Sequence, residues 1–321
     1  MDMLSMILLF LAGLALVVFG ADWLVDGASG VARRAGLSEF VIGLTIVGMG
    51  TSAPEMVVSF IGAMEGNGDI AVGNVVGSNI FNTLLILGLT AVILPMEITR
   101  GNRRRDIPVN IVVTLLLILL GLKFTLFGAG TDGLTRIDGA ILLALFAAYM
   151  FFSFKNGKAE ESQTEQAEKD RKLWVCILLI AAGITGLVVG GKLFVNNAIE
   201  IARYLGVSDK FIAITVLAGG TSLPELATCV AAAAKKKGQL ALGNIIGSNL
   251  FNILLILGGS AVIAPLSFQG INFVDMGVLM ASALALATCL FIGKRNKLDR
   301  LDGSLFLLLW AAYMTYLIIN L

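Results

Sequence analysis

The sequence contains no histidine and only three cysteines among its 321 residues. Without histidine, the chain lacks the commonest protein metal ligand and the usual general base at neutral pH. The cysteines, Cys176, Cys229 and Cys289, lie in apolar segments with no short spacing between them. We therefore expect neither a disulfide framework nor a cysteine metal cluster, and no cofactor.

Charged residues are also scarce, at 14% of the chain against about 25% in a typical soluble domain. The net charge is +1, and no basic cluster indicates nucleic-acid binding. Apolar residues make up 57% of the sequence and gather in segments close to the roughly 20 residues that cross a bilayer. We count ten such segments, at about 3–22, 39–63, 70–94, 107–126, 137–154, 173–195, 209–234, 240–264, 272–293 and 303–320.

This pattern predicts an all-α polytopic membrane protein with ten transmembrane helices, surrounded by the lipid bilayer and with no protein partner implied. The first segment has no basic flank and no small-residue cleavage site. We therefore expect it to be a structural helix rather than a signal peptide.

The chain repeats itself at an offset of 170 residues. The stretch GNVVGSNIFNTLLILG at 73–88 returns as GNIIGSNLFNILLILG at 243–258, and GTSAPE at 50–55 returns as GTSLPE at 220–225. The only long polar stretch lies between the copies. We therefore expect three parts: a five-helix repeat at 1–154, a linker at 155–172 and a second five-helix repeat at 173–321.

Lysine and arginine are distributed unevenly between alternate loops. If the N-terminus is outside, the inside loops hold 18 of these residues and the outside loops hold five. Because basic residues favour the cytoplasmic side, we expect both termini outside and the linker in the cytoplasm. An odd number of spans per repeat then makes the two repeats inverted, which is typical of secondary transporters.

Each copy of the GTS-x-PE motif places a proline and a glutamate inside an apolar span. Pro54 has no N–H and its ring clashes with the carbonyl of Gly50, so the helix should break near residues 48–52. The freed carbonyls need new partners in the membrane, and a bound cation would be one. The two motifs supply six candidate side chains: Thr51, Ser52, Glu55, Thr221, Ser222 and Glu225.

The span after each motif adds amides and hydroxyls at helical spacing. They are Asn74, Ser78 and Asn82 in the first copy and Asn244, Ser248 and Asn252 in the second. Inversion would bring both polar stripes and both glutamates together at the membrane centre. The set consists of oxygen ligands, which suit hard cations, and Ca²⁺ takes about six to eight of them. Mg²⁺ fits less well because it demands tight octahedral geometry and keeps its water.

Glu55 and Glu225 are the only acidic residues well inside the apolar spans. Two facing carboxylates repel each other in a low-dielectric site, so the empty, charged site is unfavourable. A divalent cation, several monovalent cations or protons would neutralise the pair, which couples return of the carrier to a counter-ion. A single motif would equally fit an ordinary helix start, with Thr51 as N-cap and Pro54 in the first turn. Two copies favour the ion site.

At these motifs the chain resembles the cation/Ca²⁺ exchanger superfamily, and most closely the prokaryotic Na⁺/Ca²⁺ exchangers. GTSAPE with GNVVGSNIFN, and GTSLPE with GNIIGSNLFN, look like the two α-repeats of that family. The resemblance implies that Glu55 and Glu225 are shared by Ca²⁺ and Na⁺, and that Asn82 and Asn252 hold the central position of each repeat.

The resemblance also implies a set of further Na⁺ or Ca²⁺ contacts. They come from the hydroxyls of Thr51, Ser52, Ser78, Thr221, Ser222 and Ser248, and from the backbone carbonyls of Gly48 and Ala218. It further implies a prokaryotic inner or plasma membrane, and alternating access in which the first and sixth spans slide across the others.

Two departures from the family pattern matter. Some members carry an aspartate at a central position, whereas this chain has asparagine at both, which argues against K⁺ cotransport. The linker is also too short for the Ca²⁺-sensing insert of eukaryotic-type members.

Three hypotheses follow. The first is Na⁺-driven Ca²⁺ antiport, electrogenic if several Na⁺ exchange for one Ca²⁺. The second is H⁺/Ca²⁺ exchange on the same scaffold. The third is an intramembrane enzyme with Ser52 or Ser222 as nucleophile, although neither has an obvious basic partner nearby in the sequence.

Overall fold

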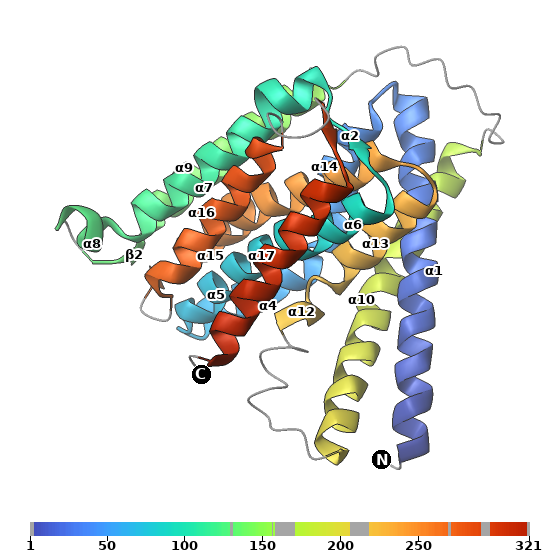
Figure 1. The fold of residues 1–321 in the computed structure, drawn as a ribbon, viewed down its shortest axis with the longest axis horizontal. Helices are drawn as coiled ribbons and strands as arrows, with labels where there is room; N and C mark the ends of the chain where they lie inside the picture. The colour runs from blue at the N-terminus through green and yellow to red at the C-terminus, as the bar shows by residue number, and fades with distance from the viewer. Residues whose placement is uncertain are drawn as a thin grey trace.

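The computed structural model describes residues 3–128, 131–155, 157, 171–205, 218–268, 271–289 and 296–319. These residues form an almost entirely helical protein (Figure 1). Among them, six helices are long and apolar enough to cross a membrane, or seven if one bent pair counts as a single span. The prediction of a helical membrane protein is therefore confirmed.

Three of the expected spans contain shorter helices. They are α7 (Ile107–Gly121), α13 (Leu223–Ala234) and α16 (Phe273–Thr288). Parts of two expected spans, residues 209–217 and 290–293, lie outside the described residues.

Two long helices, α1 (Met3–Ala35) and α10 (Leu173–Tyr204), lie side by side at one edge of the molecule (Figure 1). Glycines allow their backbones to approach closely. A Cβ atom added to Gly20 would lie 2.9 Å from the carbonyl oxygen of Gly183, and one added to Gly183 would lie 2.7 Å from the nitrogen of Leu24. Both helices contact each other far more extensively than they contact the rest of the bundle.

The expected end of the first span near residue 22 is wrong, because α1 continues to Ala35. Buried side chains such as Leu24, Val25 and Ala28 keep the helix packed beyond that point. The helix stops where Gly36 adopts a φ of 62°, the left-handed conformation that commonly terminates helices.

The first GTS-x-PE motif lies at a bend between two helical segments. The chain runs through α2 (Glu39–Ile42), a π-helical turn η1 (Gly43–Val47) and α3 (Gly48–Thr51), then bends by 50° into α4 (Ala53–Met64). Proline in the first turn of α4 begins that helix without loss of a hydrogen bond. The predicted break is confirmed. The second motif has the same form, with α12 (Ala218–Gly220) ending before α13.

The centre of the bundle consists of two helices that correspond residue for residue at the offset of 170. The first comprises α5 (Gly68–Ile80), the π-helical turn η2 (Phe81–Leu87) and α6 (Gly88–Ile93). The second comprises α14 (Gly238–Leu250), η5 (Phe251–Leu257) and α15 (Gly258–Ile263). π-Helical turns of this kind occur frequently at functional sites.

Each of two outer helices packs on the central helix of the other copy. Helix α9 (Arg136–Lys155) packs on η5 and α15 of the second copy, and α17 (Arg300–Ile319) packs on η2 and α6 of the first. Glycine pairs allow both approaches, since a Cβ at Gly139 would lie 2.6 Å from the oxygen of Gly258, and one at Gly303 would lie 2.6 Å from that of Gly88.

Four two-residue strands repeat this crosswise connection. Strand β1 (Met96–Glu97) pairs antiparallel with β4 (Lys297–Leu298), and β2 (Gly133–Leu134) pairs antiparallel with β3 (Leu266–Ser267). The first copy also contains the π-helical turn η3 (Asn102–Asp106) before α7 and the short helix α8 (Lys123–Phe127) after it.

Ion pairs fasten α1 to the second copy. Lys235, directly after α13, lies 2.9 Å from Asp22 and 2.5 Å from Asp26 of α1. Arg171, at the end of the predicted linker, also pairs with Asp26, at 3.3 Å. Lys235, one of the basic residues of a predicted inside loop, therefore also contributes packing contacts.

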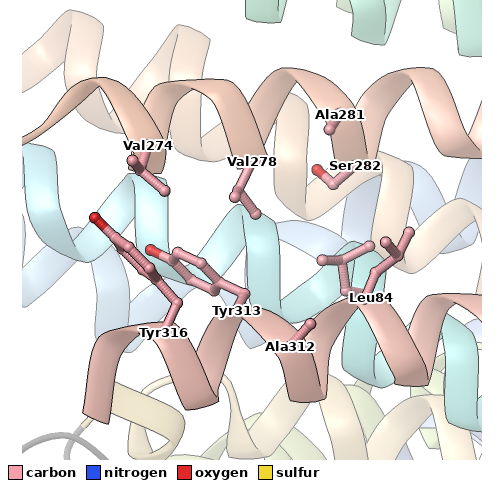
Figure 2. Close-up of a pocket in the computed structure, with 9 residues that line it drawn as sticks. Leu84, Val274, Val278, Ala281, Ser282, Ala312, Tyr313 and Tyr316 are labelled. Carbon is pink, nitrogen blue, oxygen red and sulfur yellow. The ribbon is translucent and has the colours of Figure 1, made fainter. Parts of the chain in front are cut away.

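A groove of about 200 Å³ lies between α16 and α17 (Figure 2). Its lining is almost entirely apolar and includes Val278, Ala312 and, from the central helix, Leu84. Tyr313 also lines it and donates a hydrogen bond to Asp275, at 2.8 Å. None of the predicted ion-site residues lines this groove.

Candidate ion site

The two helix breaks bring serine hydroxyls of each motif to the glutamate of the other. Ser52 donates a hydrogen bond to Oε1 of Glu225 at 2.9 Å, and Ser222 donates to Oε1 of Glu55 at 3.2 Å. Ser52 and Ser222 occupy the N-cap positions of α4 and α13, yet neither side chain caps its own helix. The simpler interpretation, in which the motif is only a helix start, therefore does not account for these hydroxyls.

Glu55 and Glu225 are both fully buried. Ser248 donates a second hydrogen bond to Oε1 of Glu225, at 3.3 Å. The other carboxyl oxygen of each glutamate, Oε2, has no hydrogen-bond partner among the described residues. Buried polar atoms without a partner are rare in native proteins and indicate a missing ligand, ion or water.

The remaining buried carboxylates differ from these two because each has clear partners. Asp106 contacts Arg105 at 2.8 Å and accepts a hydrogen bond from Tyr149. Asp138 contacts Lys123 at 2.5 Å. Within the described residues, Glu55 and Glu225 are the carboxylates that combine complete burial with the lack of a basic partner; Asp275 and Asp302 also lack one, but they are slightly exposed and accept hydrogen bonds from backbone amides.

The motif threonines also contact the opposite copy. Thr51 donates to Oδ1 of Asn244 at 3.2 Å, and Thr221 donates to Oδ1 of Asn74 at 3.4 Å. Asn74 in turn donates to the backbone oxygen of Glu55 at 3.2 Å. The structure therefore joins the outer amides of both stripes to the two motifs.

The predicted backbone ligands lie at the start of the broken segments. The carbonyl of Gly48 accepts a hydrogen bond from the Ser52 amide at 3.1 Å and lies 3.4 Å from the Thr51 hydroxyl. Ala218 begins α12, at the corresponding place in the second copy. Ser78 is buried on α5, at the position that matches Ser248.

The central amides lie in the two π-helical turns, one helical turn beyond the stripe serines. Asn82 and Asn252 are fully buried. Each uses its Nδ2 as a donor, to Oδ1 of Asn249 and of Asn79 respectively, while its own Oδ1 has no partner among the described residues. The predicted site thus contains two amide oxygens and two carboxylate oxygens that are buried and that receive no hydrogen bond from the described residues.

Sequence reasoning missed Asn79 and Asn249. Both belong to the repeated GSN-x-FN stretch, so the duplication was a signal. They fall outside the i, i+4, i+8 stripe, and only the packing of α5 and η2 against α14 reveals their partners.

An apolar helical bundle that buries two carboxylates beside broken helices is typical of an ion-coupled membrane transporter. Known proteins bear this out. The family model described as sodium/calcium exchanger protein matches residues 5–155 and 175–319. The chain belongs to the sodium/calcium exchanger family, as its resemblance predicted.

Relatives match along almost the whole chain. The putative antiporter CaxA of Alkalimonas amylolytica is 38% identical over 320 residues, which cover 97% of this chain and 98% of the relative. The sodium/calcium exchanger MaX1 of Methanosarcina acetivorans is 32% identical over 348 residues, with 97% of each chain covered.

Solved structures agree with these relatives. The structure of the sodium-calcium exchanger NCX_Mj soaked with Na⁺ and Sr²⁺ superimposes with a TM-score of 0.84 at 35% identity, covering 98% of this chain and 99% of that one. The protein is therefore an integral membrane exchanger and not an enzyme. The hypothesis of a serine enzyme is wrong. The Ser52 and Ser222 hydroxyls instead donate hydrogen bonds to the carboxylates of Glu225 and Glu55.

Proposed function

We propose that the protein is a secondary antiporter that exchanges Na⁺ for Ca²⁺ across the membrane. The observation that carries this proposal is the buried pair Glu55 and Glu225. Each glutamate accepts a hydrogen bond from a serine of the other motif, and its second carboxyl oxygen has no partner among the described residues. The names of the relatives, a sodium/calcium exchanger and an antiporter among them, support it.

The available oxygens suit Ca²⁺ as cargo. Four of the buried oxygens that lack a partner among the described residues belong to the predicted site: Oε2 of Glu55 and Glu225, and Oδ1 of Asn82 and Asn252. Neighbouring hydroxyls and waters complete the six to eight oxygens that Ca²⁺ takes in a flexible shell. The two negative charges balance one divalent cation, with no surplus to be buried.

Na⁺ uses the same carboxylates together with the flanking hydroxyls and carbonyls. We assign these contacts to Thr51, Ser52, Ser78, Thr221, Ser222, Ser248, Gly48 and Ala218. Two Na⁺ ions balance the carboxylate charge, and a third adds one positive charge, which makes the exchange electrogenic. An empty site leaves two buried negative charges, which is unfavourable, so the carrier returns only with ions bound.

The architecture that we propose has ten spans in two inverted repeats, 1–154 and 173–321, joined by a cytoplasmic linker at 155–172. The reciprocal contacts between the copies support it, since Ser52 and Ser222 exchange partners, as do α9 and α17. The excess of basic residues in one set of loops supports an orientation with both termini outside. The protein then resides in a prokaryotic plasma membrane.

We propose that α1 and α10 are the helices that move during alternating access. These two helices pack mainly on each other through glycines, so they can move as one unit across the broken helices. The four central segments, which carry the carboxylates and amides, stay fixed around the ions.

The test is uptake of radioactive Ca²⁺ into proteoliposomes loaded with Na⁺. We expect uptake that depends on an outward Na⁺ gradient. A positive interior potential should speed this uptake, because three Na⁺ leaving for each Ca²⁺ entering carry one net positive charge outward. Uptake of the same size with K⁺ or choline inside would contradict Na⁺ coupling.

H⁺/Ca²⁺ exchange is the second candidate, because the same two buried carboxylates can accept protons. A pH-sensitive dye inside the same vesicles separates the two functions. Proton movement that accompanies Ca²⁺ in the absence of Na⁺ favours the second, while Ca²⁺ uptake with no proton movement favours the first.

A further inference from the structure

Asn82 and Asn252 can each place their side-chain amide in two different orientations, whereas the two oxygens of a carboxylate are equivalent. A side-chain amide has an oxygen on one side and a donor NH₂ on the other, and only the oxygen can bind a cation. If either Asn82 or Asn252 rotated by half a turn, its NH₂ would point where the unpartnered oxygen now lies. Something must hold each amide in one orientation.

Two neighbouring asparagines supply that constraint. Nδ2 of Asn252 donates to Oδ1 of Asn79 at 2.9 Å, and Nδ2 of Asn82 donates to Oδ1 of Asn249 at 3.3 Å. Each contact crosses from one copy to the other. Both accepting side chains are almost completely buried, at 2% and 3% exposure, so water does not compete for the bond.

The orienting asparagines are themselves held in place. Nδ2 of Asn79 donates to the backbone oxygen of Asn249 at 3.1 Å. Nδ2 of Asn249 donates to the hydroxyl of Thr83 at 2.8 Å. Because their NH₂ groups are occupied, their oxygens must face the central amides, and a hydrogen-bond network of this kind defines which side of an amide carries oxygen.

We propose that Asn79 and Asn249 are positioning residues that hold the central amides with their oxygens toward the transported cation, Asn79 for Asn252 and Asn249 for Asn82. The proposal rests on the proposed cation exchange, and it explains how a site with asparagine at both centres remains an oxygen-only site. Outer residues that orient metal ligands typically change affinity by about 10–100-fold when removed.

The experiment compares Asn79→Ala in two backgrounds, because aspartate has oxygen on both sides and needs no orientation. In the otherwise unchanged protein, we expect Asn79→Ala to raise the Ca²⁺ concentration for half-maximal uptake about tenfold. In an Asn252→Asp background, the same substitution should change that concentration less than about twofold. In an Asn82→Asp background, the tenfold loss should persist, because Asn79 does not orient Asn82.

The reciprocal set reverses the pairing. Asn249→Ala should lose affinity in the unchanged protein and in the Asn252→Asp background, and should be rescued by Asn82→Asp. Equal losses in all backgrounds, or no loss at all, would overturn the proposal and leave these asparagines a purely structural role.

A milder variant covers the case in which an alanine variant does not fold. Thr83→Val removes the acceptor of Asn249 while keeping its shape, and Ile253 already occupies the matching position in the second copy. We expect a smaller affinity loss that Asn82→Asp rescues; a loss that Asn82→Asp leaves unchanged argues against the proposal. If the unchanged protein shows no cation-driven Ca²⁺ uptake, the proposed function itself fails, which is a separate result.

Discussion

At the scale of single residues, the central feature is a pair of buried glutamates whose charge only cations can balance. Removing one charge relieves the repulsion in the empty site, and the serine hydroxyl can still donate to an amide oxygen. We therefore expect Glu55→Gln and Glu225→Gln each to abolish exchange while the protein still folds.

Transport assays and unfolding temperatures in cation-free detergent solution check this prediction. The variants should unfold at the same temperature as the unchanged protein or higher, and added Ca²⁺ should stabilise only the unchanged protein. Glu65→Gln, at the exposed end of the same helix, is the matched control and should retain transport. Full exchange by either buried-site variant would remove that glutamate from the ion site.

Much of the site could be predicted from residues alone because the motif occurs twice. Glu55, Ser52 and Thr51 each have a counterpart at the same offset, and duplication of costly groups in an apolar span signals function. The exchange of partners between Ser52 and Ser222 could not be predicted in detail, and neither could the roles of Asn79 and Asn249. Those depend on which faces of two helices meet, which no spacing in the sequence encodes.

At the scale of elements, the close packing of α1 on α10 depends on glycines at particular positions. A Cβ at Gly190 would lie 2.7 Å from Cβ of Leu16 and 2.9 Å from the backbone oxygen of Gly13, whereas one at the adjacent Gly191 meets nothing within 4 Å. Gly190→Ala should therefore push the helices apart, at a cost of about 1–3 kcal/mol.

Gly191→Ala is the matched control in the same helix. Alanine favours helix over glycine by about 1 kcal/mol, so this variant should be neutral or slightly stabilising. Unfolding temperatures and transport rates of the two variants check the prediction. If both substitutions have the same effect, tight packing at Gly190 is not what holds α1 to α10.

Helix breaks were predictable from local chemistry, and π-helical turns were not. Pro54 removes a backbone donor, so the bend follows from one residue. The turns η2 and η5 arise in apolar runs with no proline or glycine inside them. The wider hydrogen-bond pattern is favoured there by tertiary packing around Asn82 and Asn252, and that packing is absent from any local window of sequence.

At the scale of the whole molecule, the proposed inversion predicts that equivalent loops face opposite sides of the membrane. The turn after α4 and the turn after α13 correspond at the offset of 170, and both Glu65 and Lys236 are exposed. A membrane-impermeant maleimide should label Glu65→Cys from outside the cell and Lys236→Cys only in inverted vesicles.

The native cysteines offer little background, since Cys176, Cys229 and Cys289 are all buried. Labelling of both introduced cysteines from the same side would contradict inverted repeats.

The strand pairs between the copies, β1 with β4 and β2 with β3, could not be predicted from the sequence because two-residue strands carry no pattern.

The most direct test of the account is anomalous X-ray scattering from crystals grown with Ca²⁺ and then transferred to Na⁺. We expect a Ca²⁺ peak between the carboxylates of Glu55 and Glu225, within bonding distance of both, which disappears when Na⁺ replaces Ca²⁺. A Ca²⁺ peak elsewhere in the molecule, with the space between the two glutamates empty, would contradict it.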